Sequence, residues 1–114
     1  QKSAYFNHMW QKRQFENHST LPSVLVNLGN KLNVKFLLDT GSSLSLIGEK
    51  LFKCLVEMKL VSKLRETSVQ CVSAGNQRMN VLGLIDLKIK IDNLSWKVCL
   101  IVIKDLSQNG ILGA

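Results

Sequence analysis

Aromatic residues and long apolar runs are scarce in this sequence, and each shortage excludes a class of protein. Aromatic residues make up 6% of the 114 residues, so the core must rest on leucine, valine and isoleucine. No apolar run approaches the roughly 18 residues that a membrane span requires, and the N-terminus has no apolar signal region. We therefore expect a soluble chain that is not secreted by itself and has no membrane partner.

Cysteine and histidine are also few. Cys54, Cys71 and Cys99 are widely spaced and odd in number, which favours free thiols in a reducing compartment over a disulfide framework. His8 and His18 lie in a polar segment with no cysteine cluster beside them. Because zinc sites need closely spaced ligands, the sequence predicts no metal site, and nothing in it indicates another cofactor.

The net charge is +7 and the isoelectric point is near 9.6, values that are typical of nucleic-acid-binding proteins. The lysines are scattered, however, and those after residue 30 alternate with apolar positions: Lys31, Lys35, Lys50, Lys53, Lys59, Lys63, Lys88, Lys90, Lys97 and Lys104. Scatter of this kind is typical of solvent-facing positions on strands and helices. We therefore interpret the charge as a solvated surface and expect no nucleic-acid partner.

Length and composition predict one small domain preceded by an extension. With 46% apolar residues, a chain of 114 residues has enough material for a single core. Residues 1–20 are rich in glutamine, asparagine, histidine, lysine and arginine, so we interpret them as an N-terminal extension or linker with some helical character. The composition changes at Leu21-Pro22, and residues 21–114 form the predicted domain.

From residue 21 the pattern is that of short strands joined by turns. The expected strands are residues 24–28, 32–38, 44–47, 67–72, 78–91 and 94–103. The expected turns are Gly29-Asn30, residues 73–77 and Asp92-Asn93. Apolar residues at helical spacing predict a short helix from about residue 49 to residue 59. The fold class is therefore all-β, a small closed barrel with one short helix.

Asp39 stands at the end of an apolar run, Phe36-Leu37-Leu38. Burying a lone carboxylate costs several kcal/mol unless the group is hydrogen-bonded or shares a proton. Thr40 and Ser42 supply hydroxyl groups, and Gly41 allows a close backbone approach. On these four residues alone an ordinary turn between two strands is favoured over a catalytic loop, because aspartate and glycine are both turn formers.

The context of Asp39 resembles the active-site segment of retropepsins, the aspartic proteases of retroviruses, LTR retrotransposons and derived host genes. The resemblance covers residues 21–114. It includes the hairpin before Asp39, a flap-like hairpin with its tip near Gly75, and two later motifs, Val81-Leu82-Gly83 and Ile111-Leu112-Gly113. It implies the retropepsin fold, with a flap hairpin, and the activity of an aspartic endopeptidase.

Aspartic proteases use two carboxylates that share one proton, one acting as a base on water and the other as an acid toward the scissile carbonyl. Only Asp39 is followed by Thr-Gly, and we interpret Asp86, Asp92 and Asp105 as solvated carboxylates. The resemblance therefore implies a C2 homodimer in which a second copy supplies the second aspartate.

The resemblance also implies roles for neighbouring residues. Thr40 would brace the two loops across the dimer, and Gly41 would hydrogen-bond the substrate backbone. Ser42 would donate to the carboxylate and so favour its ionised form, which shifts the pH optimum to lower values than in Ser42→Ala. The residues that would contact substrate are Ser43, Ser73, Ala74, Gly75 and Ile111. For Ile111, plain core packing is the competing interpretation.

Viral retropepsins continue past the Ile-Leu-Gly motif into a helix and a strand, so we expect the domain over residues 21–114 to be truncated. The first functional hypothesis is an endopeptidase that cleaves extended, mainly apolar segments of a Gag-Pol-like polyprotein, inside the cell, in the cytoplasm or in virus-like particles. The second is a catalytically weak or inactive module for dimerisation or peptide binding. The third is a basic nucleic-acid-binding barrel, which the few aromatic residues do not favour.

Overall fold

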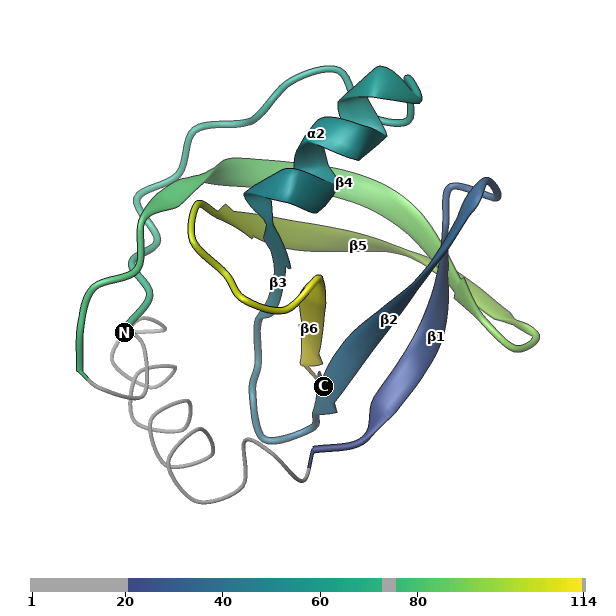
Figure 1. The fold of residues 1–114 in the computed structure, drawn as a ribbon, viewed down its shortest axis with the longest axis horizontal. Helices are drawn as coiled ribbons and strands as arrows, with labels where there is room; N and C mark the ends of the chain where they lie inside the picture. The colour runs from purple at the N-terminus through teal and green to yellow at the C-terminus, as the bar shows by residue number, and fades with distance from the viewer. Residues whose placement is uncertain (1–20, 73–75, 114) are drawn as a thin grey trace.

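The computed structural model describes residues 21–72 and 76–113. Within these ranges the chain forms β1 (Ser23–Leu28), β2 (Leu32–Asp39), β3 (Ser45–Gly48), α2 (Glu49–Glu57), β4 (Val81–Ile91), β5 (Leu94–Ile103) and β6 (Gly110–Gly113). The strands close into a barrel in the order β1-β2-β6-β3-β5-β4 (Figure 1). The all-β prediction is therefore confirmed. The expected extension over residues 1–20 and the flap tip at residues 73–75 lie outside the described residues.

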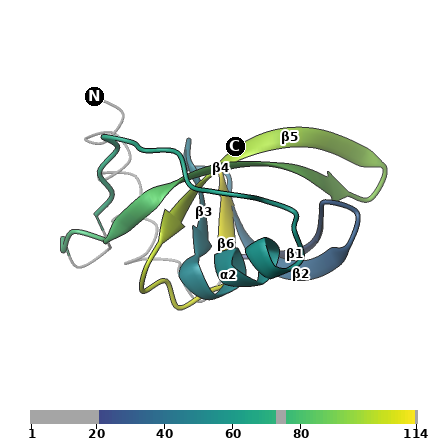
Figure 2. The ribbon, with the colours of Figure 1, turned by 90° about the horizontal axis from the view of Figure 1, so that it is seen from above.

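Two antiparallel hairpins make up most of the barrel. β1 pairs with β2, and their turn residues Gly29 and Asn30 have φ angles of 57° and 64°. Positive φ at both positions is typical of a type I′ turn, which the Lys31 N–H closes by donating to the Leu28 carbonyl at 3.0 Å, and the pairing of Leu28 with Leu32 leaves three residues in the connection. A Cβ atom on Gly29 would lie 2.6 Å from the Leu60 side chain. The second hairpin, β4–β5, extends beyond the rest of the barrel (Figure 2).

The helix α2 follows β3 directly and begins at Glu49, where the predicted helix begins. Leu51 and Leu55, one turn apart, are its buried side chains. The helix ends at Glu57, earlier than expected, because Lys59 adopts a left-handed conformation with a φ of 61° and donates its backbone N–H to Val56.

The strand predicted for residues 67–72 is wrong. In this region the described residues contribute only isolated bridges, Arg65 with Leu84 and Val72 with Arg78. The backbone N–H of Val69 donates to the Thr67 hydroxyl at 3.0 Å, and this local bond takes a donor that a strand ladder would use. The strand predicted for residues 78–91 is shorter than expected: β4 begins at Val81.

The core has two parts and rests on aliphatic residues, as predicted. The larger cluster lies between the barrel and α2 and includes Val26, Leu28, Phe36, Ile47, Leu55, Ile85, Ile89 and Leu100. The smaller cluster lies around β6 and consists of Leu46, Cys71, Ile101, Ile103 and Ile111. Through β6 the smaller cluster borders Asp39, because β6 runs directly beside the end of β2 that carries this residue.

The three cysteines are free, and only Cys71 is buried. Burial raises the pKa of the Cys71 thiol to about 11, because the thiolate would lose its hydration. Since the unfolded chain ionises this group at lower pH, its contribution to stability is complete below about pH 9 and is lost as the pH rises toward about 11.

Wild type should therefore lose about 2–3 kcal/mol of unfolding free energy between those two pH values that Cys71→Ala does not lose. Relative to wild type, the variant becomes more stable by that amount as the pH rises. Denaturant unfolding across the alkaline range measures this difference. Cys54→Ala is the matched control because Cys54 is exposed, and its difference from wild type should not change with pH. Parallel curves for wild type and Cys71→Ala would contradict the prediction.

Candidate active site

Asp39 is the last residue of β2 and lies where β2 runs parallel to β6. Leu37, Leu38 and Asp39 are the partners of Ile111, Leu112 and Gly113. The Asp39 side chain is fully buried, and its Oδ1 accepts a hydrogen bond of 3.1 Å from the backbone N–H of Gly41. The apolar approach predicted from Phe36-Leu37-Leu38 therefore carries a carboxylate into the interior, where a backbone donor meets it.

The residues after Asp39 form a tight turn. The backbone N–H of Ser42 donates to the carbonyl of Asp39 at 3.0 Å, which closes the turn over Thr40 and Gly41. An aspartate that accepts from the amide two residues later is a common turn former. The turn interpretation and the catalytic interpretation of these residues therefore describe the same geometry.

The Ser42 hydroxyl does not have the partner that the retropepsin resemblance implied. It donates to the carbonyl of Leu44 at 3.0 Å and accepts from the Leu44 backbone N–H at 3.2 Å. A hydroxyl group has one proton, and here the loop backbone takes it. The expectation that Ser42 contacts the Asp39 carboxylate is therefore corrected: in this structure Ser42 holds the loop together.

A second serine connects the loop region to β6. Ser45, at the start of β3, is 9% exposed, and its Oγ accepts a hydrogen bond of 3.0 Å from the Gly113 backbone N–H. A Cβ atom on Gly113 would lie 2.5 Å from the carbonyl oxygens of Ser42 and Leu44. Only glycine fits where β6 passes this closely behind the loop that follows Asp39. The close packing of β6 against the loop therefore depends on two features: residue 113 has no side chain, and the Ser45 hydroxyl accepts the hydrogen bond of its amide.

Comparison with known proteins agrees with this arrangement. Residues 24–114 match the family model described as aspartyl protease. The chain belongs to the aspartyl protease family. No curated protein matches the sequence significantly.

Solved structures give the fold of this aspartyl protease-family chain. It superposes on EIAV protease in complex with the inhibitor HBY-793 with a TM-score of 0.63 and 20% identity, over 85% of each chain. The retroviral protease-like domain of Ddi1 from Leishmania major gives 0.62 and 22%, over 82% of this chain and 72% of that one. A retropepsin-like aspartic protease from Rickettsia conorii gives 0.57 and 22%, over 85% and 69%. The fold is that of the retropepsins.

The other residues predicted for the protease site are distributed as follows. Thr40 and Ser43 are exposed, and Gly41 is half-buried on the loop. Ile111 is fully buried in the smaller core cluster, so in the single chain it packs as a core residue, and its contact with substrate stays a prediction. The predicted flap residues Ser73, Ala74 and Gly75 lie outside the described residues.

Three other aspartates were expected to be solvated carboxylates. Asp92 and Asp105 are exposed. Asp86 is also exposed but is paired: both its oxygens accept from Arg65 at 3.0 Å, and this hydrogen bond and charge raise the pKa of Arg65. The part of the aspartyl protease domain that the structure describes has no cluster of histidine, cysteine and acidic residues suited to a metal ion.

Sequence reasoning identified Gly113 through the Ile111-Leu112-Gly113 motif but missed Ser45 and its hydrogen bond to the Gly113 amide. A serine between Leu44 and Leu46, in a short strand, is the available signal, because a buried hydroxyl needs a partner. The sequence pattern could not identify the Gly113 amide as the partner of Ser45, because the two residues are far apart in the chain and residues 110–113 show no strand periodicity.

Ser45→Ala should lower the free energy of unfolding by about 1–3 kcal/mol, because it leaves the Gly113 amide without its acceptor. Ser43→Ala makes the same chemical change at an exposed position of the same loop and should stay within about 0.5 kcal/mol of wild type. Urea unfolding of the three proteins measures this. Equal effects of the two substitutions would show that the Ser45–Gly113 bond carries no stability.

Ser42→Ala tests the corrected role of Ser42. We expect a loss of about 1–3 kcal/mol in unfolding free energy, because both backbone groups of Leu44 lose their partner. We also expect no change in the pH profile of peptide cleavage, measured on the active protein. A profile displaced to higher pH in the variant would instead support direct contact between the hydroxyl and the Asp39 carboxylate.

Proposed function

We propose that this chain is an aspartic endopeptidase that acts as a homodimer, with one Asp39 from each copy. The observation that carries the proposal is the position of the Asp39 carboxylate: it is buried, hydrogen-bonded by the Gly41 amide, and held on a tight Asp-Thr-Gly turn at the end of β2. Membership of the aspartyl protease family and the retropepsin fold support it.

The reaction needs two carboxylates, and one chain supplies one. The remaining aspartates discussed above, Asp86, Asp92 and Asp105, are exposed and lie outside the catalytic loop. A C2 partner would bring a second Asp39 to the first. One carboxylate then removes a proton from water as the water attacks the peptide carbonyl, while the other, protonated, donates to the carbonyl oxygen.

The exposed position of Thr40 suits a residue that braces a second loop across the dimer axis. The half-buried Gly41 can offer its backbone to an extended substrate. Neither contact requires a change in the turn, because the turn is closed by the Ser42 amide and the Asp39 carbonyl. The catalytic loop is therefore preorganised before a partner arrives.

The substrate class that we propose is an extended, mainly apolar peptide segment of a Gag-Pol-like polyprotein. The predicted flap supports it: Val72 pairs with Arg78, and the Met79 amide donates to the Cys71 carbonyl at 2.9 Å, so two antiparallel arms lead to the tip at residues 73–75. Such a hairpin can clamp an extended backbone through its amides. The proposed substrate contacts are Ser43, Ser73, Ala74, Gly75 and Ile111.

The proposed place of action is inside the cell, in the cytoplasm or in virus-like particles. The thiols support this proposal, because Cys54 and Cys99 are free and exposed, as is usual in a reducing compartment. No helix among residues 21–72 and 76–113 has the length and apolar character needed to cross a membrane.

One observation favours a second function, a peptide-binding or dimerisation module with little catalysis. The Asp39 side chain is 0% exposed in the single chain, and a carboxylate that activates water must be reachable by water. If pairing of two copies does not open a path to Asp39, the fold remains and the chemistry is lost.

Cleavage of a peptide library by the full chain and by Asp39→Asn distinguishes the two functions. We expect pepstatin-sensitive cleavage by wild type and a loss of at least about a hundredfold in Asp39→Asn, because the amide cannot act as a base. Asp92→Asn is the matched control, since Asp92 is exposed, and should cleave as wild type does.

Equal cleavage by wild type and Asp39→Asn would contradict the catalytic role of Asp39. Cleavage by neither, together with peptide binding and a dimeric mass in sedimentation, would support the binding module in place of the enzyme.

A further inference from the structure

The outward side of the β4–β5 hairpin carries three exposed lysines, Lys88, Lys90 and Lys97, which we call the lysine face. Along β4 these lysines alternate with the buried Leu87 and Ile89, so they point away from the core. The strand register places Lys88 directly opposite Lys97, with Lys90 opposite Ser95 on the next outward position. Residues that look scattered along the chain therefore converge on one surface.

The positive charge of the lysine face is not balanced within the described residues. Like charges directly opposite each other on neighbouring strands destabilise a sheet. The nearest outward carboxylate along β4 is Asp86, and Arg65 already holds both of its oxygens at 3.0 Å. Within the described residues no ion pair joins a lysine of this face to a carboxylate.

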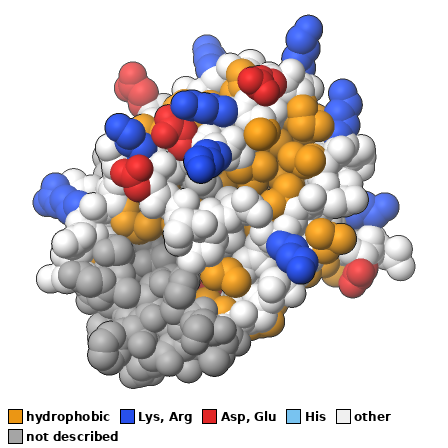
Figure 3. Space-filling view, in the orientation of Figure 1, with side chains coloured by type: hydrophobic (Ala, Val, Ile, Leu, Met, Phe, Trp, Pro, Cys, Tyr) orange, Lys and Arg blue, Asp and Glu red, His pale blue; other side chains and the backbone are white. Residues whose placement is uncertain are grey.

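The surface around α2 differs from the lysine face. There, basic and acidic side chains are intermingled (Figure 3), and Lys53 lies 3.8 Å from Glu49 on the same helix. A mixed surface of this kind is the ordinary solvated arrangement, with pairs worth a few tenths of a kcal/mol. The α2 surface therefore offers an internal control for the effect of overall charge.

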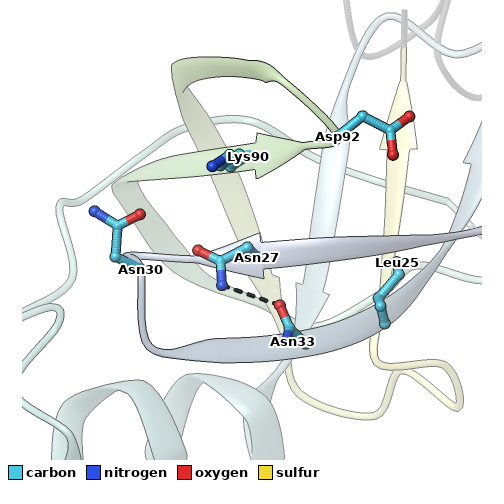
Figure 4. A pocket seen from close by; sticks show the side chains of 6 residues that line it. All are labelled: Leu25, Asn27, Asn30, Asn33, Lys90 and Asp92. Carbon is cyan, nitrogen blue, oxygen red and sulfur yellow. Dashed lines mark hydrogen bonds between the residues drawn. The ribbon is translucent and has the colours of Figure 1, made fainter.

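A polar hollow of about 340 Å³ adjoins the lysine face at Lys90 (Figure 4). Its lining residues are Leu25, Asn27, Asn30, Asn33, Lys90 and Asp92. The Asn27 side chain donates to Asn33 at 3.0 Å, so two strands present their amide groups side by side. Side-chain amides and ammonium groups are donors that phosphate oxygens accept readily. Asp92 lies at the turn end of the hollow, so the anion is expected toward Asn33 and Lys90.

We propose that the lysine face and the adjoining hollow bind the phosphodiester backbone of a nucleic acid, without reading its sequence. Positively charged lysines with amide donors recognise phosphates, and binding of this kind depends on charge and not on base identity. The proposal is independent of the protease function, because none of its residues lies on the catalytic loop.

Two other anionic partners must be distinguished from a nucleic acid. An acidic peptide adds as a strand along a free sheet edge. Residues 94–99 of β5 pair with β4 alone among the described strands, so this edge is open to a peptide, and polyglutamate serves as its probe below. A membrane surface requires apolar side chains that insert beside the cations, and Leu25 is the single apolar residue that lines the hollow. Trp96 lies opposite Ile89, on the other side of the sheet, so base stacking on this face is not expected either.

Two variants that each remove three positive charges test the proposal. One replaces the three residues of the lysine face by glutamine, and the other replaces Lys50, Lys53 and Lys63, which are exposed on or after α2. The probe is a short fluorescent oligouridylate, and its anisotropy is followed with the full chain over a range of salt concentrations. Both variants keep residues 1–20, so any contribution from that segment is common to them.

We expect the lysine-face variant to bind at least about tenfold more weakly than wild type at low salt, and the slope of log K against log salt to fall by about 2. The control variant should lose less than about threefold. Thermal unfolding should show an unchanged or higher midpoint for the lysine-face variant, because the opposed Lys88–Lys97 pair is gone. Weaker binding then cannot be attributed to unfolding.

Three results would overturn the proposal. Wild type could show no salt-dependent binding to the oligonucleotide. The two variants could lose affinity equally, which would mean that overall charge alone attracts the probe. Polyglutamate, at equal concentration of charges, could displace the oligonucleotide as well as unlabelled oligouridylate does, which would identify an acidic polypeptide as the partner class.

Discussion

The burial of the Asp39 carboxylate is the constraint on which the rest of the site depends. A buried carboxylate is tolerated only where donors are aimed at it, and here one donor is the Gly41 backbone amide, two residues later in a closed turn. That turn needs support from behind. The support comes from β6, which runs parallel to β2 and reaches Gly113 beside Asp39.

The position of β6 in turn determines much of the barrel. β6 lies between β2 and β3, so the strand before the Asp39 turn and the strand after it are both joined to the same short segment. Glycine at position 113 lets that segment approach the carbonyl groups of the loop, and the Ser45 hydroxyl accepts a hydrogen bond from the Gly113 amide. Ile111 anchors the segment in the smaller core cluster. The loop that follows Asp39 and the smaller core cluster therefore form one packed unit, and a substitution that disrupts either one is expected to disturb the other.

Much of this could be predicted from local sequence. The β1–β2 hairpin has a turn pair, Gly29-Asn30, whose conformation is set by residue type, and α2 has apolar residues at helical spacing. The Asp39 turn was predicted for the same reason, since aspartate followed by glycine strongly favours one local geometry. In each case the information lies within a few residues of the feature.

The features that could not be predicted depend on partners distant in the chain. The Ser42 hydroxyl had two possible acceptors, and only the loop geometry shows that Leu44 is the one used. Residues 67–72 have β character, but the Val69 N–H donates to the Thr67 hydroxyl, and among the described residues only an isolated bridge, Val72 with Arg78, forms in this segment. Lys88 and Lys97 become neighbours only through the β4–β5 register, so the scatter of lysines along the sequence did not reveal their convergence.

The central claim is that Asp39 is half of a catalytic pair, and mixing two kinds of chain tests it most directly. Equal amounts of wild type and Asp39→Asn are unfolded together and refolded as a mixture. Peptide cleavage is then measured at the same total protein concentration as for wild type alone. Random pairing leaves about one quarter of the dimers with two aspartates, so the account predicts about one quarter of the wild-type rate. A rate of about one half would mean that each chain acts alone, and it would contradict the shared dyad.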